Sequence, residues 1–320
     1  MSNTNRGLVT VFGGSGFVGK HAVRALVKDG WRVRVATRSP HTEGDLKVIG
    51  AVGQIQLVQA NLRFPDSVAR ALDGADAVVN LVSVLFEAGR QTFNALNVEG
   101  VRTIAAAAKE RGIKNVVHIS SIGANPESDA EYSETKGEGE RVLREIIPGA
   151  DILRPSIIFG PEDNFFNKFA AMAQIAPALP LIGGGETKFQ PVYVADVAAA
   201  IAACLKSGTS GQTYELGGPQ TYSFKELLQF TLDATGRKRF LAPLPWPIAG
   251  LVGFAGEMSG YLPFVDPFLT RDQVENLKPD NVVTDGAKSF SDLGITPEAL
   301  EAIVPAYLVR FRKYGQFSQA

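Results

Sequence analysis

The chain has 320 residues, of which 45% are hydrophobic and 20% are charged, and its formal net charge is −1. This length allows one large domain or two coupled domains, and the nearly neutral charge argues against a nucleic-acid partner, because phosphate binding needs concentrated lysine and arginine. The single cysteine, Cys204, excludes a disulfide framework, and the sequence groups no His, Cys, Asp and Glu residues at metal-ligand spacing.

Short apolar runs alternate with amphipathic stretches through the first half of the chain. The expected strands cover residues 8–12, 32–37, 54–59, 77–82 and 116–120, and a sixth opens at 152–153. The expected helices between them cover residues 17–29, 65–72, 92–111 and 133–147. This alternation indicates a parallel sheet covered on both faces, and right-handed crossovers make it a doubly wound, Rossmann-type α/β fold.

Beyond Gly160 the prolines become denser and the expected strands become sparser. Asp196 has the residue type of an N-cap for a helix over 197–206. The other elements that we expect here are helices at 165–175 and 224–235, a glycine loop at 183–185 and a strand at 214–216.

The change of rhythm predicts two domains. Residues 1–160 form the Rossmann domain, which a later strand and helix around 190–206 complete. Residues 161–320 form a smaller C-terminal α+β domain, which covers the cleft and carries a candidate interaction surface.

A glycine-rich turn follows the first expected strand. Its residues are Gly13, Gly14, Ser15, Gly16, Phe17, Val18 and Gly19, which match Gly-x-x-Gly-x-x-Gly from Gly13 and Gly-x-Gly-x-x-Gly from Gly14. Glycines there allow a tight turn, a close approach of the backbone to a pyrophosphate, and close packing of the next helix. The free N–H groups at the start of that helix favour an anion, so the turn predicts a dinucleotide.

Arg38 identifies the expected dinucleotide. An NAD site usually has Asp or Glu at the end of the second strand, whereas this chain has Arg38 and no carboxylate there. A guanidinium can pair with a 2′-phosphate, so we expect NADP(H) rather than NAD(H). The alternative is that Arg38 is an ordinary solvated surface residue.

Tyr132 and Lys136 form a Tyr-x-x-x-Lys pair at the start of a helix. That spacing places both side chains on one helical face, where the ammonium favours phenolate and lowers the tyrosine pKa. The pair can therefore donate or accept a proton beside a nicotinamide.

With this pair the chain resembles the short-chain dehydrogenase/reductase superfamily over residues 7–236. Further matches are Asn80-Leu81-Val82, Asn97, Leu153-Arg154-Pro155 and the run from Pro191 to Val197. The resemblance implies further cofactor contacts at Asn61, Leu62, Leu81, Val82, Pro155, Ile157 and Ile158, with Asn61 in the place of the usual adenine-contacting Asp.

The third catalytic group of the superfamily is a Ser or Thr after the fifth strand, and that position falls on Ile122 here. Ser121 can replace it only in a shifted register. Loss of one hydrogen-bond donor to a developing oxyanion typically costs ~10²–10³ in rate. Activity is therefore left open, with Tyr132, Lys136 and Ser121 as the candidate catalytic residues.

A closer resemblance is to the atypical branch typified by the nucleotide-binding accessory subunit of respiratory complex I. It rests on residues 158–163, 190–194, 243–245 and 269–275. It implies an NADPH-holding accessory or assembly protein of a membrane-bound NADH:quinone oxidoreductase. The alternative is an active NADP(H)-dependent oxidoreductase or isomerase acting on a carbonyl, quinone-related or sugar-nucleotide substrate.

The basic run Arg237-Lys238-Arg239 precedes an apolar stretch over residues 240–256 that contains Trp246 and three prolines. The prolines argue against a spanning helix, and no run of about 20 apolar residues is uninterrupted. The stretch either rests on a membrane surface or partner protein, or packs within the second domain. We expect a bacterial-type cytoplasm, or a peripheral place on the cytoplasmic face of the inner membrane.

Overall fold

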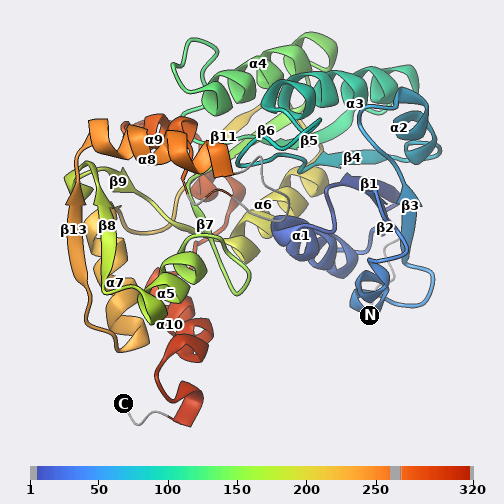
Figure 1. The fold of residues 1–320 in the computed structure, drawn as a ribbon. Helices are drawn as coiled ribbons and strands as arrows, with labels where there is room; N and C mark the ends of the chain where they lie inside the picture. Colours follow the sequence, from blue (N-terminus) through green and yellow to red (C-terminus); the bar gives the residue numbers. More distant parts are fainter. Residues whose placement is uncertain (1–5, 260–266, 268, 318–320) are drawn as a thin grey trace. The chain divides into compact units, whose positions relative to one another are not determined.

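The computed structural model describes residues 6–259, 267 and 269–317 and divides into two compact units (Figure 1). Unit 1 comprises Met1–Pro155, Ala195–Glu215 and Ala287–Ile295. Unit 2 comprises Ser156–Val194, Leu216–Gly286 and Thr296–Ala320. Each unit therefore uses stretches that are far apart in the sequence.

A seven-stranded sheet forms the centre of unit 1, with the strand order β11-β6-β5-β4-β1-β2-β3. Its strands are β1 Leu8–Phe12, β2 Arg32–Thr37, β3 Ile55–Gln59, β4 Ala77–Asn80, β5 Asn115–Ile119, β6 Asp151–Pro155 and β11 Thr213–Leu216. The pairs from β3 to β6 are parallel, with Thr10 of β1 opposite both Arg34 and Val78. The predicted doubly wound α/β fold is confirmed.

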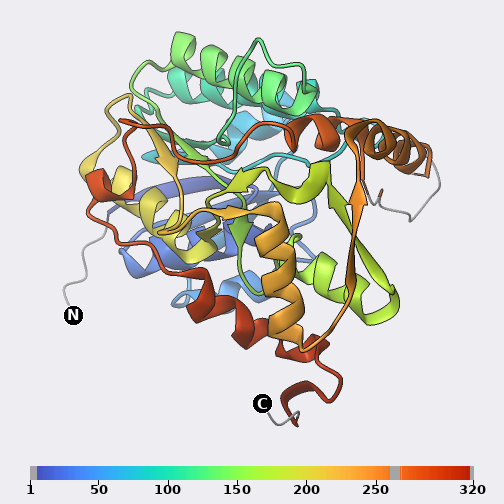
Figure 2. The same cartoon turned by 90° about the vertical axis from the view of Figure 1, so that its left-hand side faces the viewer.

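Helices cover both faces of this sheet (Figures 1 and 2). They are α1 Phe17–Lys28, α2 Pro65–Ala71, α3 Glu99–Glu110, α4 Glu131–Ile146 and α6 Val194–Ser207. One buried cluster joins α2, α3 and α4 to the sheet through Phe12, Leu72, Ile104 and Leu143. Because both faces are covered, the strand centres are apolar on both sides, with Val11 and Val35 on one face and Phe12 and Ala36 on the other.

The sequence-based boundaries need two corrections in unit 1. The helix expected over 92–111 runs without a break over 93–110, but it is not α-helical throughout, because its segment Asn94–Val98 is π-helical. Asp196 is not an N-cap, because α6 begins at Val194 and places Asp196 in its first turn. An acidic residue is favourable in a first helical turn as well as at an N-cap, so the residue type alone could not separate the two positions.

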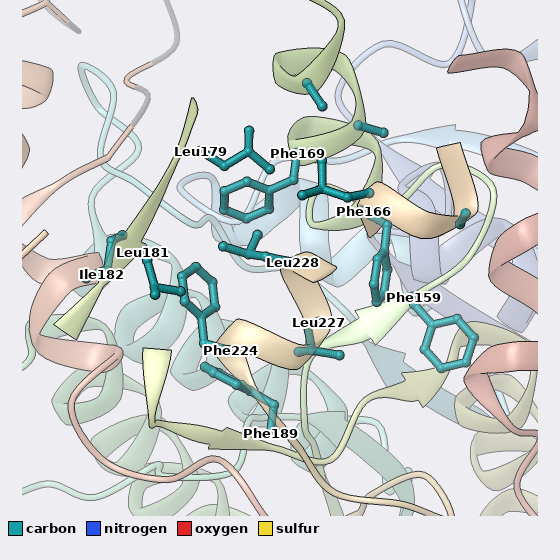
Figure 3. Packing of buried hydrophobic residues seen from close by; sticks show 14 of the residues in the cluster. Phe159, Phe166, Phe169, Leu179, Leu181, Ile182, Phe189, Phe224, Leu227 and Leu228 are labelled. Carbon is teal, nitrogen blue, oxygen red and sulfur yellow. The ribbon is translucent and has the colours of Figure 1, made fainter. Parts of the chain in front are cut away.

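Unit 2 is built from short elements around an aromatic core (Figure 3). Its helices are α5 Phe166–Ile175, α7 Phe224–Thr235, α8 Trp246–Ser259, α9 Arg271–Asn276 and α10 Leu300–Leu308. Two-stranded sheets pair β7 Ile158–Phe159 with β10 Val192–Tyr193, β9 Lys188–Phe189 with β12 Tyr222–Ser223, and β8 Ala178–Ile182 with β13 Phe240–Leu244.

Phe224 organises this core. Its ring centroid lies 5.8 Å from that of Phe169 and 6.3 Å from that of Phe189. These aromatic contacts join α7 to α5 and β9 at distances that favour edge-on packing. A capping box between Ser223 and Glu226 starts α7 at the predicted residue.

The apolar stretch over 240–256 forms β13 and α8, neither of which the sequence predicted. Pro243 is tolerated because β13 belongs to a two-stranded sheet, and Pro247 is tolerated because it lies in the first turn of α8. Among the described residues, no helix is both long and apolar enough to cross a bilayer.

Candidate dinucleotide site

The predicted site residues of unit 1 lie mainly at the carboxyl edge of the sheet. The strand order reverses between β1 and β4, and ligands of open α/β sheets bind outside the carboxyl ends at such a reversal. Gly13 follows β1, whereas Leu81 and Val82 follow β4. The main chain at Gly13 is in close contact with the main chain of these two residues. A Cβ atom added at Gly13 would lie 3.1 Å from the carbonyl carbon of Leu81 and 3.2 Å from the Val82 nitrogen.

Three glycines of the turn have different surroundings. Gly13 has φ +78°, which favours glycine. A Cβ atom at Gly19 would lie 2.2 Å from the Gly13 oxygen, so α1 packs directly on the turn. Gly16 is exposed, and a Cβ atom there would meet only the Gly13 oxygen, at 3.4 Å. In the spacing Gly-x-x-Gly-x-x-Gly, Gly13 therefore forms the turn, Gly16 leaves the backbone open to a ligand, and Gly19 allows the helix to pack closely.

The remaining residues of the turn have supporting positions. Gly14 is buried, and a Cβ atom there would lie 2.9 Å from a methyl group of Val35. Ser15 is half-buried in the loop, and Phe17 and Val18 open α1. The first N–H groups of a helix have no partner within it, so these residues offer donors to an anion.

Arg38 and Asn61 line one pocket of about 180 Å³ at the ends of β2 and β3. The guanidinium of Arg38 is exposed, and its Nη1 donates to Gln91 Oε1 at 2.6 Å. The sequence reasoning missed the other lining residues, which are Gln59, Ala60, Phe64, Ser67 and Arg70. Leu62 does not line this pocket; it is 7% exposed and belongs to the core on the α2, α3 and α4 face.

Lys136 is buried and reaches the end of β5. Its Nζ donates to the Ile119 carbonyl oxygen at 3.1 Å and lies 5.8 Å from the centroid of the Tyr132 ring. Burial lowers the pKa of Lys136 to about 8, although the nearby Glu140 carboxylate acts in the opposite direction. Tyr132 is half-buried, and its ring packs edge-on against Phe93 with centroids 5.7 Å apart. The structure thus brings the Tyr-Lys pair together on α4.

His118 occupies the interior of β5. Its Nδ1 lies 3.2 Å from Asn80 Nδ2, while Asn80 Oδ1 accepts from the Val82 N–H. The Asn80 amide therefore donates to Nδ1, and the neutral ring carries its proton on Nε2. Burial, together with the Lys136 charge, lowers the pKa of His118 to about 3.

Three buried polar atoms follow one another near the end of β5. They are His118 Nε2, Ser120 Oγ and Ser121 Oγ, and they have no hydrogen-bond partner among the described residues. Ile122, also buried, donates its main-chain N–H to the Pro155 oxygen at 3.0 Å and offers only an apolar side chain. Ser121 is therefore the hydroxyl with unused hydrogen-bonding capacity next to Ile122.

Asn97 lies in the π-helical segment, and its side chain is buried. Its Nδ2 donates to Thr135 Oγ1 and its Oδ1 accepts from Ser83 Oγ, both at 3.1 Å. Asn97 therefore links the loop after β4 to the helix that carries the Tyr-Lys pair. Such π-helical segments are frequent at functional sites.

Pro155 is the last residue of β6, whereas Ile157 and Ile158 belong to unit 2. In that unit the Ile157 oxygen accepts from the Val192 N–H at 2.9 Å, and Ile158 lies on β7. Within unit 1, the site offers a turn open to an anion, a pocket lined by two arginines, a Tyr-Lys pair, and the Ser121 hydroxyl, which has no hydrogen-bond partner among the described residues.

Mitochondrial proteins of at least five organisms match nearly the whole chain. A mitochondrial NADH dehydrogenase [ubiquinone] 1 alpha subcomplex subunit 9 from Arabidopsis thaliana is 35% identical over 96% of this chain and 79% of that protein. The mitochondrial NADH-ubiquinone oxidoreductase 40 kDa subunit from Neurospora crassa is 31% identical over 96% of this chain and 80% of that protein. These eukaryotic relatives do not support the expected bacterial-type cytoplasm.

Solved structures agree with the fold. The crystal structure of gox2253 superposes with a TM-score of 0.72 and 25% identity, covering 98% of this chain and 100% of that chain. A dTDP-glucose 4,6-dehydratase from Streptomyces venezuelae, with NAD bound, has a TM-score of 0.71 and 21% identity over 95% of this chain and 96% of that chain.

The family model for the NAD dependent epimerase/dehydratase family matches residues 9–217, which span the glycine turn, the Tyr-Lys pair and β11. The description of this family and that of the dehydratase structure both include NAD. The resemblance to short-chain dehydrogenases and to the complex I subunit is thereby confirmed, and the chain belongs to the NAD dependent epimerase/dehydratase family.

Proposed function

We propose that the chain is an NADP(H)-binding accessory or assembly subunit of a membrane-bound NADH:ubiquinone oxidoreductase. The observation that carries this proposal is the extent of the similarity. The family model ends at residue 217, whereas the complex I subunits match 96% of the chain and therefore most of unit 2 as well. The NAD-bound dehydratase also covers 95% of the chain but is only 21% identical, so it is the identity of 31–35% over this extent that favours the complex I subunits.

The choice of NADP(H) rests on the end of β2. Arg38 stands where an NAD site usually has a carboxylate, and none of the seven residues lining its pocket is acidic. Gly16 leaves the turn open toward a pyrophosphate. Lys136 and Tyr132 would contact the nicotinamide ribose, and Leu81, Val82 and Pro155 would border the cofactor.

In this proposal the nucleotide is mainly a structural ligand. A ligand that binds only the folded state stabilises it by about 2.7 kcal/mol when its concentration is a hundredfold above Kd. Ile122 supports a role in which the protein binds the nucleotide without catalysis, because the position expected to polarise a substrate carbonyl has no hydroxyl.

The outer face of α8 supports a membrane-bound partner. Ala249 and Gly253 are buried, and a Cβ atom at Gly253 would lie 2.8 Å from the Arg271 nitrogen, so this face packs on the start of α9. The opposite face exposes large apolar side chains at helical spacing, namely Ile248, Leu251, Phe254 and Met258. Exposed apolar surface of this kind is typical of protein or membrane contacts.

Two observations favour a second function, that of an active NADP(H)-dependent oxidoreductase. The Ser121 hydroxyl is buried without a partner among the described residues, and Lys136 has a lowered pKa beside Tyr132. Bound NADP(H) would supply hydride chemistry. Tyr132 would then donate or accept the substrate proton, Lys136 would stabilise its phenolate, and Ser121 would donate to the substrate oxygen.

One experiment separates the two functions. The purified protein is denatured to release and identify its nucleotide, and the native complex is mixed with carbonyl and quinone substrates while the absorbance of reduced nicotinamide is followed. NADPH that stays bound without turnover, together with co-purification with respiratory complex subunits, is expected. Turnover that Tyr132→Phe abolishes would instead establish the oxidoreductase.

A further inference from the structure

The pocket at the ends of β2 and β3 holds a second arginine for which the proposed function has no role. Its lining residues combine two guanidinium groups, Arg38 and Arg70, with the amides of Gln59 and Asn61 and the hydroxyl of Ser67. Among the described residues no acidic side chain lines it, so the two like charges share the pocket without a counter-charge from its lining. A pocket of this composition favours a compact anion with several acceptor oxygens.

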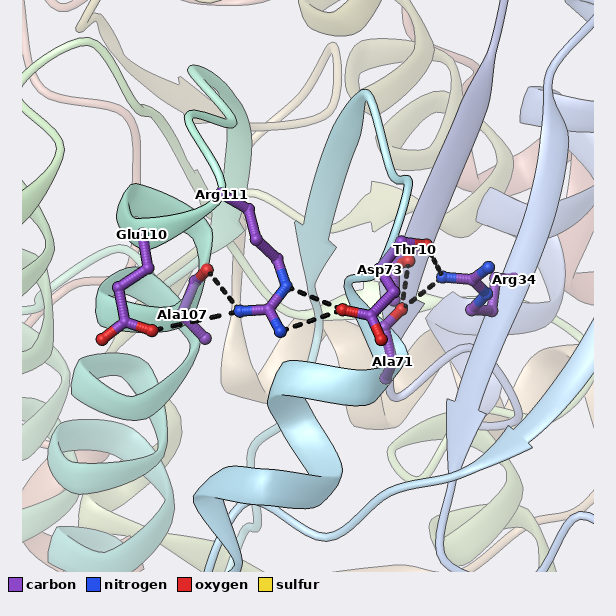
Figure 4. A network of polar contacts seen from close by, with 7 residues as sticks. All are labelled: Thr10, Arg34, Ala71, Asp73, Ala107, Glu110 and Arg111. Atoms are coloured by element: carbon purple, nitrogen blue, oxygen red, sulfur yellow. Dashed lines mark hydrogen bonds and ion pairs between the residues drawn. The ribbon is translucent and has the colours of Figure 1, made fainter.

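The main chain next to Arg70 is firmly held. Arg70 is the next-to-last residue of α2, and the following Ala71 oxygen accepts from Thr10 Oγ1 at 2.8 Å and from Arg34 Nη1 at 2.9 Å (Figure 4). Thr10 is fully buried in β1. These bonds fix the last turn of α2 to two strands of the sheet.

Asp73 extends this attachment. Its main-chain oxygen accepts from Arg34 Nη1 at 2.7 Å, and its carboxylate accepts from Arg111 Nη2 at 2.9 Å (Figure 4). The residues after α2 are thus tied to β2 and to the end of α3. Because Arg70 stands on a fixed backbone, only its side chain has to become ordered when a ligand binds, which keeps the entropic cost small.

The other arginine is also oriented before binding. Gln91 Oε1 accepts from Arg38 Nη1, which leaves the Nε and Nη2 groups of Arg38 available as a planar pair of donors. Phe64, at the start of α2, is 60% exposed and lines the same pocket, so it offers an aromatic face to a base.

We propose that Arg70 is the second cationic contact of the NADP(H) 2′-phosphate and therefore determines specificity together with Arg38. The phosphate monoester binds between guanidinium groups that come from the end of β2 and the last turn of α2. This inference rests on the proposed function, since it concerns the same dinucleotide. The competing interpretation is that Arg70 is a solvated surface residue that only borders the pocket.

The test measures the Kd of NADPH, NADH and 2′,5′-ADP by calorimetry for the wild-type chain and for Arg70→Gln. We expect the Kd of NADPH and of 2′,5′-ADP to rise about tenfold or more, because hydrogen bonds to charged groups are among the stronger ones. The Kd of NADH should change less than about twofold, since NADH has no 2′-phosphate. Arg63→Gln is the matched control, because Arg63 is an exposed arginine of the same segment that does not line the pocket.

The outcomes separate this inference from the proposed function. If Arg38→Gln raises the Kd of NADPH and Arg70→Gln does not, the proposed role of Arg70 is wrong and the NADP(H) proposal stands. If Arg70→Gln raises the Kd of NADPH and the Kd of NADH by the same factor, the proposed role of Arg70 in specificity is also overturned. If the wild-type chain prefers NADH or binds neither nucleotide, the proposed NADP(H) function itself is wrong, and the role of Arg70 is lost with it.

Discussion

Lys136 Nζ donates a hydrogen bond to the Ile119 carbonyl oxygen at 3.1 Å, and so ties the middle of α4 to the last residue of β5. The ammonium group reaches this oxygen through the core, with Lys136 only 2% exposed. Burying a charge next to one neutral acceptor is costly, and the pKa of about 8 reflects that cost.

Raising the pH should stabilise the protein relative to Lys136→Met. The pKa of Lys136 is about 8 in the folded chain and 10.5 in the reference state. Between these values the unfolded state binds more protons, so the free energy of unfolding rises with pH, by at most about 1.4 kcal/mol per pH unit. Denaturant titrations of both chains from pH 7 to 10.5 test this. The exposed Lys109→Met should track the wild type, and a pH-independent gap between wild type and Lys136→Met would contradict the assignment.

Acid should destabilise the protein through His118. Its pKa falls from 6.5 to about 3 on folding, so the stability it contributes is complete above pH 6.5 and is lost as the pH falls toward 3. The variant His118→Gln should therefore lose less stability than the wild type between pH 6.5 and 4.5. The exposed His41→Gln serves as the control and should behave like the wild type. Parallel melting curves for all three chains would rule out a buried neutral histidine.

Alanine substitutions at two glycines of the turn should have different effects on stability and on NADPH binding. Gly19→Ala places a Cβ atom 2.2 Å from the Gly13 oxygen, and backbone cannot move away cheaply, so we expect a loss of about 2 kcal/mol or more. Gly16→Ala keeps an allowed backbone with φ −75° and ψ 179°, so stability should change by less than about 0.5 kcal/mol while NADPH affinity falls. Thermal melts and NADPH titrations of both variants distinguish these effects. Equal destabilisation would show that Gly16 serves packing instead of ligand access.

The outer face of α8 should matter for association and not for folding. Leu251 is 69% exposed, so Leu251→Glu should leave the thermal midpoint within about 2 °C of the wild type, as surface substitutions usually do. Co-fractionation with respiratory membranes should fall severalfold. Val48→Glu, at a residue 84% exposed in unit 1, is the matched control and should co-fractionate like the wild type. Unchanged co-fractionation of Leu251→Glu would place the partner contact elsewhere.

Local patterns were enough to predict much of unit 1. The structure has the strands Leu8–Phe12 and Arg32–Thr37 and the glycine turn where the sequence predicted them. Such elements can be predicted because an apolar run that ends at glycine or at a polar residue is a pattern of only a few residues. Arg38 and Asn61 were each expected to contact the dinucleotide, and they line one pocket because both follow parallel strands whose ends lie together.

Arg70 could not be predicted in this way. It faces the pocket because Thr10 and Arg34 hold the Ala71 oxygen across sequence separations of 61 and 37 residues. The π-helical segment was missed for a similar reason: Asn97 bonds to Ser83 and Thr135, and neither contact has a periodicity in the sequence. In unit 2, short strands such as β9 and β12 consist of two residues each, which is too short for an alternating pattern.

Unit 1 is built from three separate stretches of the sequence, and this affects how the newly synthesised chain can fold. The candidate-site residues of unit 1 end at Pro155, yet β11 and the stretch Ala287–Ile295 follow much later, and the Glu215 N–H donates to the Lys288 oxygen at 2.8 Å. At roughly 5–20 residues per second, the nascent chain spends several seconds with β6 as an open sheet edge. Until β11 is synthesised, the main-chain groups along that edge of β6 are open to pairing with another chain.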